Sequence, residues 1–137
     1  MLDRSDVRAA VAHPVTVFGT DSAARAPEGR LGRGQPHPRG YGAFPRLLGR
    51  YADSLPDLVR RMTALPAERF GLGERGLVIP GAAADLVVFD PATVADVATY
   101  QNPHRFPVGV RWVIVNGTVV VGPEGQRDAL PGRVLRS

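Results

Sequence analysis

The sequence lacks several residue types and segments whose absence excludes whole classes of protein. None of its 137 residues is cysteine, so neither a disulfide framework nor a cysteine-ligated metal site can form within the chain. No apolar run approaches the roughly 18 residues that a membrane-spanning helix needs. Residues 1–14 carry acids and no long apolar stretch, unlike a signal peptide. We therefore expect a cytoplasmic protein with no membrane partner.

Lysine is also absent, because all 17 basic residues are arginine. The net charge of +4 invites a nucleic-acid hypothesis. The arginines are nevertheless scattered along the whole sequence and form no basic cluster. This pattern indicates a general bias toward Arg and Ala, and we expect no nucleic-acid partner.

The length suits one domain of ordinary size with a real core, but not a complete (β/α)8 barrel, which needs roughly 200 residues. A composition of 44% hydrophobic and 22% charged residues is typical of a soluble globular chain. The 16 glycines and 13 prolines predict many turns and loops.

The first half of the chain predicts one strand and then helices. Residues 15–18 (VTVF) are predicted to form a buried strand that ends at Gly19-Thr20-Asp21, and residues 22–43 a long loop. Apolar residues from Phe44 onward recur at helical spacing. Ser54 then caps a predicted helix with Pro56 in its first turn, and residues 63–70 form a further short helix that ends at glycines.

The last third predicts a small antiparallel β unit. Strands are expected at residues 76–81, 85–89, 110–115 and 118–121, and Asn116-Gly117 between the last two is a strong hairpin signal. The runs DLVVF and TVVV are too continuously apolar for a sheet with an exposed face. The chain offers few other strands, so we expect that part of their covering layer is missing.

Several segments resemble the N-acyl-D-amino-acid deacylases (D-aminoacylases) of the amidohydrolase superfamily. Residues 72–90 contain a Gly-rich turn followed by Pro-Gly and then DLVVFD, and residues 113–117 (VIVNG) precede VVV; both are similar to the general superfamily ending. The narrower resemblance is carried by residues 37–46 (HPRGYGAFPR), 100–104 (YQNPH) and 131–135 (PGRVL).

The resemblance implies an α/β fold that is only part of a larger protein. Residues 1–71 would be the last strand and helices of a (β/α)8 metal-dependent hydrolase barrel, and residues 72–137 would be strands of a small β-sandwich. The implied function is zinc-dependent hydrolysis of the amide bond of N-acyl-D-amino acids, which are small-molecule substrates. The fragment by itself is expected to be inactive, because it needs the N-terminal part of the enzyme. The alternatives are another activity of the superfamily, such as hydantoin-type cyclic-amide hydrolysis, and a non-catalytic scaffold or binding domain.

Asp21 is the first candidate catalytic residue, because it follows a predicted barrel strand at the end where barrel active sites form. The resemblance implies that this carboxylate takes a proton from the attacking water and passes it to the leaving amine. A divalent metal lowers the pKa of a bound water to about 7, and a nearby carboxylate then shuttles the proton. The family more often has Ser where this chain has Thr20, a change that keeps the hydroxyl. The alternative is that Asp21 only begins a turn or caps a helix.

Arg39 and His37 lie in the loop after that strand and are candidate substrate-binding residues. An arginine holds a carboxylate through two parallel hydrogen bonds, and N-acyl amino acids carry a carboxylate. A loop-pinning Arg39 and a purely structural His37 are the alternatives. His13 and His104 are expected to have structural roles. The three histidines show no metal-binding spacing, so no complete metal site is predicted in this chain; Asp21 is a potential ligand, and the remaining ligands are expected upstream.

Overall fold

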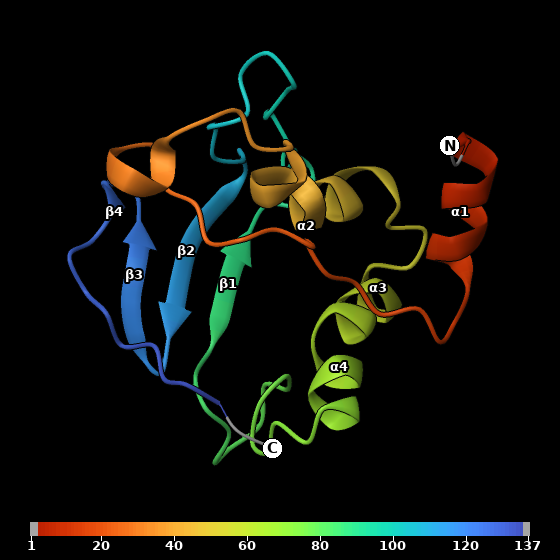
Figure 1. The fold of residues 1–137 in the computed structure, drawn as a ribbon. Helices are drawn as coiled ribbons and strands as arrows, with labels where there is room; N and C mark the ends of the chain where they lie inside the picture. Colours follow the sequence, from red (N-terminus) through yellow and green to blue (C-terminus); the bar gives the residue numbers. More distant parts are fainter. Residues whose placement is uncertain (1–2, 136–137) are drawn as a thin grey trace. The chain divides into compact units, whose positions relative to one another are not determined.

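The computed structural model describes residues 3–135, whose helices and strands are shown in Figure 1. Within this part of the chain the helical elements are α1 (Arg4–Ala12), the short 3-10 helix η1 (Gly29–Gly32), α2 (Arg39–Arg50), α3 (Leu55–Met62) and α4 (Ala64–Arg69). The strands are β1 (Leu86–Phe89), β2 (Val110–Val115), β3 (Thr118–Gly122) and β4 (Gly125–Gln126). The expected α/β class is therefore confirmed, with one small antiparallel sheet. No helix among these residues is long and apolar enough to cross a membrane.

The chain forms two compact units, each built from segments that are far apart in the sequence. The sheet unit contains residues 3–17, 54–89 and 110–135, and the α2 unit contains residues 18–53 and 90–109. These two units reflect only the contacts within this chain, and not the domains of a longer protein. The predicted boundary between a barrel part (residues 1–71) and a β-sandwich part (residues 72–137) refers to a longer protein and stays a prediction.

The sheet has the strand order β1-β2-β3-β4, and every neighbouring pair is antiparallel. The turn between β2 and β3 is made by Asn116 and Gly117, whose φ angles of 46° and 78° both lie in the left-handed region. A two-residue turn with positive φ at both positions matches the right-handed twist of the flanking strands, which is why Asn-Gly is favoured there. The predicted hairpin is confirmed.

A polar cluster ties this hairpin to the segments before β1 and after β4. The Asn116 backbone N–H donates to Asp85 Oδ1 at 2.8 Å, and Arg75 pairs with the Asp85 carboxylate and donates to Asn116 Oδ1 at 2.8 Å. The Asn116 side-chain amide donates to the carbonyl of Pro131 at 2.6 Å. These bonds hold the strand ends at one side of the sheet, which hydrophobic patterning alone could not show.

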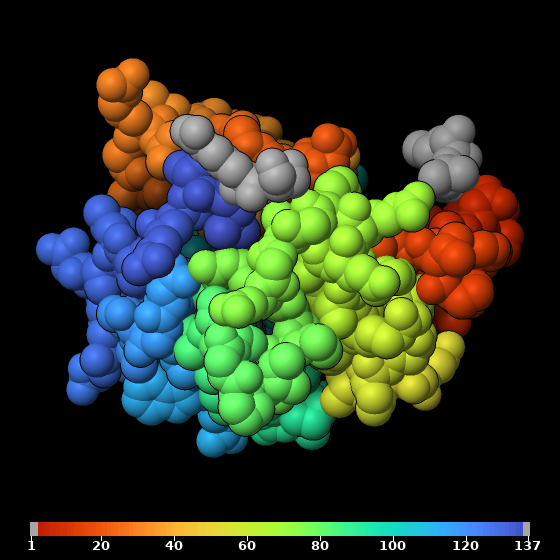
Figure 2. Space-filling model, turned by 90° about the horizontal axis from the view of Figure 1, so that it is seen from below, coloured from red at the N-terminus to blue at the C-terminus, as the bar shows by residue number. Residues whose placement is uncertain are grey.

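Large apolar side chains of the sheet unit remain exposed, as the continuous apolar runs predicted. Val87 and Val88 are neighbours on β1, so they point to opposite faces of the sheet, and both are about half exposed, at 55% and 46%. The loop before β1 also exposes Leu77, Val78 and Ile79, and it forms part of the green surface seen in Figure 2. The strand predicted at residues 76–81 is wrong. Gly76 and Gly81 adopt positive φ angles, and the segment between them forms bends and turns without a paired neighbour.

The strand predicted at residues 15–18 is also wrong for this chain, because these residues form no strand and Val15 is exposed. A strand needs a hydrogen-bonding neighbour, and a barrel strand needs one on each side. No strand among residues 3–135 pairs with this segment. The apolar β-branched residues of this segment favour an extended conformation, but they do not provide the neighbouring strand that a β-strand needs.

Helix α1 was missed by the sequence reasoning, although its start signal is present. The Asp3 carboxylate accepts hydrogen bonds from the backbone N–H groups of Ser5 and Asp6, and the Asp6 carboxylate accepts the backbone N–H of Asp3. This reciprocal pair is a capping box with aspartate at both positions. The Ser5 hydroxyl and then the two backbone amides hold the pKa of Asp3 below its usual value, because each hydrogen bond favours the charged carboxylate.

The helices after α1 are largely as predicted. Ser54 precedes α3 with Pro56 in the first turn, although its side chain makes no capping bond, and α4 ends before Gly71. Helix α2 begins at Arg39, five positions before the expected Phe44 (39 against 44). The earlier start has a structural cause, since the His37 ring accepts the Arg39 backbone N–H at 3.0 Å and so caps the helix.

Asp96 anchors the segment after β1 to helix α2 within the α2 unit. Its side chain is only 5% exposed, and Oδ2 receives Arg46 Nε at 2.9 Å and Arg46 Nη2 at 2.6 Å. Gly42 lets the two segments approach, because a Cβ built there would lie 3.0 Å from the Asp96 Cβ. Arg50 lies farther away, with Nε 3.5 Å from Asp96 Oδ1. The buried carboxylate therefore depends mainly on Arg46.

Replacing Arg46 with alanine is expected to lower the free energy of unfolding by about 2 kcal/mol, the size of a lost hydrogen bond to a charged group. The loss leaves a buried carboxylate without its closest partner. Arg50→Ala is the matched control and is expected to cost under about 1 kcal/mol, as for an exposed ion pair. Urea unfolding followed by circular dichroism measures both. Equal losses in the two variants would contradict the ranking.

Candidate functional site

Asp21 lies in an exposed loop of the α2 unit, in a conformation that few residues adopt. Its φ angle is 46°, one of the positive values found at residues other than glycine in the described chain. Its side chain is 89% exposed. A non-glycine residue in the left-handed region carries a conformational cost of order 1 kcal/mol and is often found at functional sites. The carboxylate is thus presented to solvent by a backbone that is not relaxed.

Arg39, at the first position of α2, holds Asp21 by two contacts from a single nitrogen. Nη2 lies 2.7 Å from Asp21 Oδ2 and donates to the Asp21 backbone oxygen at 2.7 Å. Among residues 3–135, the Nε and Nη1 groups of Arg39 make no hydrogen bond or ion pair. A guanidinium carries five N–H donors, so Arg39 can position Asp21 and still offer donors to a carboxylate.

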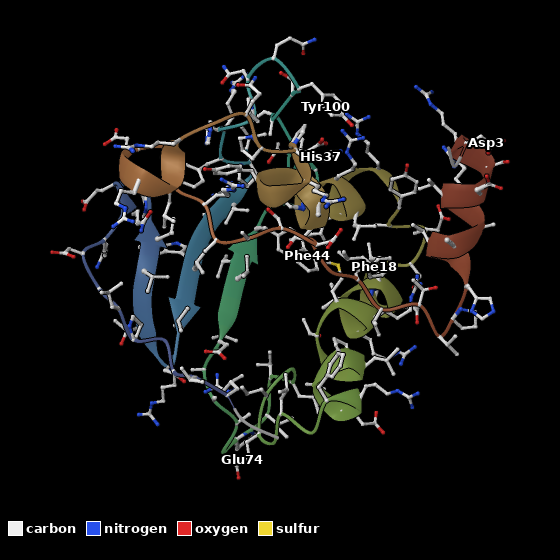
Figure 3. The ribbon with its side chains drawn as sticks, viewed as in Figure 1. Asp3, Phe18, His37, Phe44, Glu74 and Tyr100 are labelled. Carbon is white, nitrogen blue, oxygen red and sulfur yellow. The ribbon has the colours of Figure 1, made fainter. Side chains whose placement is uncertain are left out.

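His37 links Arg39 to a residue from a distant segment. Its Nδ1 accepts the Arg39 backbone N–H at 3.0 Å, and its Nε2 lies 2.8 Å from the hydroxyl of Tyr100. The His37 and Tyr100 rings meet edge to face with their centroids 5.0 Å apart (Figure 3). Both ring nitrogens are therefore engaged. The structure brings together Asp21, Arg39 and His37, the three residues predicted from the sequence, and adds Tyr100.

The segment that carries Tyr100 is fastened to the segment before α2. Gln35 Nε2 donates to the carbonyls of Tyr100 and Gln101 at 2.8 and 3.2 Å. His104 bonds to the Gly34 carbonyl at 3.1 Å and to the Tyr41 hydroxyl at 3.1 Å. Sequence reasoning gave no site role to Tyr100 or Gln35. Both lie in or beside motifs that were noticed, but no spacing rule pairs residues 35 and 37 with residue 100.

The two other histidines take no part in the group around Asp21. His104 has both ring nitrogens bonded within the α2 unit, in a loop and not in the β region where it was expected. His13 follows α1 in the sheet unit, and its carbonyl accepts a hydrogen bond from Arg61 at 3.1 Å. Neither residue adds to the group around Asp21.

The residues around Asp21 do not by themselves form a site for a metal ion. No group of three or more His, Cys, Asp or Glu side chains that could hold a metal occurs among residues 3–135. Asp21 is paired with Arg39, and both nitrogens of His37 are already bonded. A catalytic zinc needs three protein ligands and an open position. The described donor set therefore does not fit zinc without further ligands.

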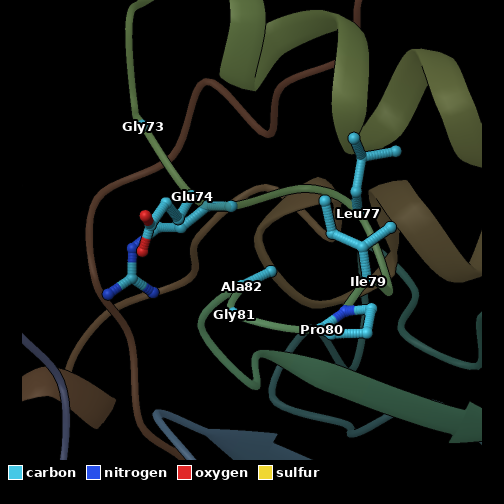
Figure 4. A pocket seen from close by; sticks show the side chains of 8 residues that line it. Gly73, Glu74, Leu77, Ile79, Pro80, Gly81 and Ala82 are labelled. Atoms are coloured by element: carbon cyan, nitrogen blue, oxygen red, sulfur yellow. The ribbon is translucent and has the colours of Figure 1, made fainter.

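A hollow in the sheet unit is lined by fewer chemically reactive groups than the Asp21 group contains. It is formed by the loop before β1 (Figure 4). Its lining residues are Gly73, Glu74, Arg75, Leu77, Ile79, Pro80, Gly81 and Ala82. They include a single carboxylate and no histidine, and Arg75 among them is already engaged with Asp85 and Asn116. The candidate site is therefore the group formed by Asp21, His37, Arg39 and Tyr100.

Comparison with known proteins gives the family. The amidohydrolase family profile matches residues 4–121, most of the chain. The chain belongs to the amidohydrolase family. Over 98% of its length, this amidohydrolase chain is 42% identical to the D-aminoacylase of Alcaligenes xylosoxydans xylosoxydans, of which it covers 28%.

Solved structures of amidohydrolases have the same fold over this region. A crystal structure of D-aminoacylase has a TM-score of 0.87 with 43% identity, and N-acyl-D-glutamate deacylase from Bordetella bronchiseptica has a TM-score of 0.83 with 44% identity. The former match covers 100% and the latter 99% of this amidohydrolase chain, and each covers 28% of the solved chain. The deacylase was solved with zinc and a phosphonate that mimics the tetrahedral intermediate. The chain thus spans just over a quarter of the length of these relatives.

Proposed function

We propose that the protein to which this chain contributes hydrolyses the amide bond of N-acyl-D-amino acids, releasing a D-amino acid and a carboxylate. The observation that carries this proposal is the 42% identity to D-aminoacylase over nearly the whole chain. The second relative, N-acyl-D-glutamate deacylase, cleaves the same type of bond by its name and supports the same reaction class. The side chain and acyl group that are preferred stay open, because relatives with different substrates match about equally well.

Asp21 is the proposed catalytic residue. Its exposed carboxylate acts as a general base toward the attacking water and then as a general acid toward the leaving nitrogen. Arg39 has a double role: one nitrogen positions Asp21, and the remaining donors bind the substrate carboxylate. His37 supports this arrangement by capping the helix at Arg39. Arg39 is the first residue of α2, so its charge adds to the positive end of the helix dipole, and both favour bound carboxylates.

The proposed cofactor is zinc, in line with the deacylase structure that contains zinc. Another D-aminoacylase structure is described with a binuclear metal centre, so the number of metal ions stays open. When bound, zinc supplies Lewis-acid activation of the water and the amide carbonyl. The ligands that residues 3–135 do not provide are proposed to come from regions of the longer protein that this chain does not match, with Asp21 as a possible addition.

The same relatives support a proposed architecture for the longer protein. Residues 1–71 are proposed to complete a (β/α)8 barrel, in which residues 15–18 gain neighbouring strands. Residues 72–137 are proposed to form part of a β-sandwich whose other strands cover β1. The exposure of Val15, Val78 and both faces of β1 supports this proposal, since such apolar surface is normally buried.

A chimeric enzyme tests the function. The chain replaces the matching segment of the Alcaligenes xylosoxydans D-aminoacylase, and the chimera is assayed with N-acetyl-D-methionine, its L-enantiomer and a 5-substituted hydantoin. We expect hydrolysis of the D-substrate at a rate within about tenfold of the parent, because the chain brings a complete Asp21 group. Preference for the hydantoin would favour cyclic-amide hydrolysis. A folded, zinc-loaded chimera without turnover would favour a non-catalytic scaffold.

A further inference from the structure

Two tyrosine–histidine pairs in the α2 unit differ in the direction of their hydrogen bonds. Tyr100 pairs with His37 at 2.8 Å, and Tyr41 pairs with His104 at 3.1 Å. In each pair the other ring nitrogen has a partner of known character. That partner determines which ring nitrogen carries the proton of an uncharged imidazole. The position of this proton in turn determines whether the tyrosine hydroxyl donates to the imidazole or accepts from it.

In the pair of Tyr41 and His104, the hydroxyl proton is used. His104 Nε2 lies 3.1 Å from the carbonyl oxygen of Gly34, which can only accept. Nε2 therefore carries the proton, and Nδ1 has a free lone pair. The Tyr41 hydroxyl donates to that lone pair, so it has no proton to offer a ligand.

In the pair of Tyr100 and His37, the hydroxyl proton is not used. The backbone N–H of Arg39 donates to His37 Nδ1 at 3.0 Å, so this nitrogen cannot carry a proton. His37 Nε2–H consequently donates to the Tyr100 oxygen. The Tyr100 hydroxyl keeps its own proton for a further acceptor, and 67% of the residue is exposed. Gln35 holds the Tyr100 backbone, so the donor is fixed in position and open to solvent.

The groups around the Tyr100 hydroxyl favour an anion as its hydrogen-bond acceptor. Tyr100 shares the His37 ring with the first residue of α2, where the helix dipole is positive. The first backbone amides of α2 are already satisfied by His37 and Pro38, so they cannot bind an anion themselves. Side-chain donors must do so instead. The unpaired nitrogens of Arg39 and the hydroxyl of Tyr100 are the donors in this group that remain.

We propose that Tyr100 is a substrate-binding residue whose hydroxyl donates a hydrogen bond to the carboxylate of the N-acyl amino acid, alongside Arg39. This assignment rests on the proposed function and adds a second donor for the same carboxylate. His37 is a positioning residue, because it orients the Tyr100 oxygen and leaves the hydroxyl proton directed at the ligand.

Binding to the metal-depleted chimera tests the assignment without turnover. Calorimetry compares N-acetyl-D-methionine with its primary amide, which lacks the carboxylate charge. Tyr100→Phe is expected to raise the Kd of the acid by about tenfold or more, the effect of one lost hydrogen bond to a charged group. It is expected to raise the Kd of the amide by less, because the neutral amide oxygen accepts a weaker hydrogen bond. The matched control Tyr41→Phe is expected to leave both within about twofold, because its hydroxyl is already used by His104.

Three results would overturn the assignment. They are an unchanged Kd of the acid in Tyr100→Phe, an equal loss for acid and amide, and no detectable binding of the acid by the unsubstituted chimera. Circular dichroism shows whether each variant is folded. Turnover after zinc is restored to the unsubstituted chimera separately judges the proposed function, so the two proposals can fail independently.

Discussion

Replacing Asp21 with asparagine in the chimeric enzyme is expected to lower kcat by at least about a hundredfold, the low end for a lost general acid–base group. Asparagine has nearly the same shape as aspartate and tolerates the left-handed conformation, with φ of 46°, that Asp21 adopts. It also keeps the backbone oxygen and a side-chain oxygen for Arg39. The substitution therefore removes proton transfer while it preserves the local structure.

The kinetic signature separates this role from a structural one. The proposed role places Asp21 at the reacting atoms, so kcat and kcat/KM are expected to fall together while the KM changes little. Zinc content and the circular dichroism spectrum are measured in parallel and are expected to stay close to those of the unsubstituted chimera. Asp53→Asn, at another exposed carboxylate of the α2 unit, is the control and is expected to keep full turnover. Near-normal turnover in the Asp21 variant would disprove the assignment.

The 137-residue chain alone is expected neither to hydrolyse N-acyl-D-amino acids nor to retain zinc after dialysis. Among residues 3–135 no three potential ligands converge, whereas a catalytic zinc site uses three. His37 is the histidine near Asp21, and its two nitrogens are bonded to Arg39 and Tyr100. Binding a metal there would break one of these bonds.

Metal analysis and a deacylation assay on the purified chain check this expectation directly. The chain exposes Leu77, Val78, Ile79 and the two faces of β1. It is therefore also expected to bind a hydrophobic dye more strongly than the chimera, in which the proposed covering layer would bury this surface. One zinc per chain together with measurable turnover would show that a complete site exists in these residues. Weaker dye binding by the chain than by the chimera would contradict the proposed covering layer.

The sequence by itself determined the local elements whose signals lie within a few residues. Asn116-Gly117 fixed the hairpin because only a few residues adopt positive φ at both turn positions. Pro56 marked the start of α3, and the glycines after α4 marked the end of that helix, for similarly local reasons. The apolar run of β1 also pointed to the valines that the structure leaves exposed, since burial preference belongs to the side chains themselves, and the missing covering layer stays a prediction.

Only the tertiary structure decided the features that depend on distant partners. The strand propensity of residues 15–18 did not produce a strand, because a strand exists only with a hydrogen-bonding neighbour. Asp21 and Arg39 were predicted singly, but their ion pair became visible only in the folded chain. The free hydroxyl proton of Tyr100 depends on an imidazole 63 positions away, whose tautomer is set by a third residue. Hydrogen-bond direction is a property of that three-dimensional network, and no sequence spacing encodes it.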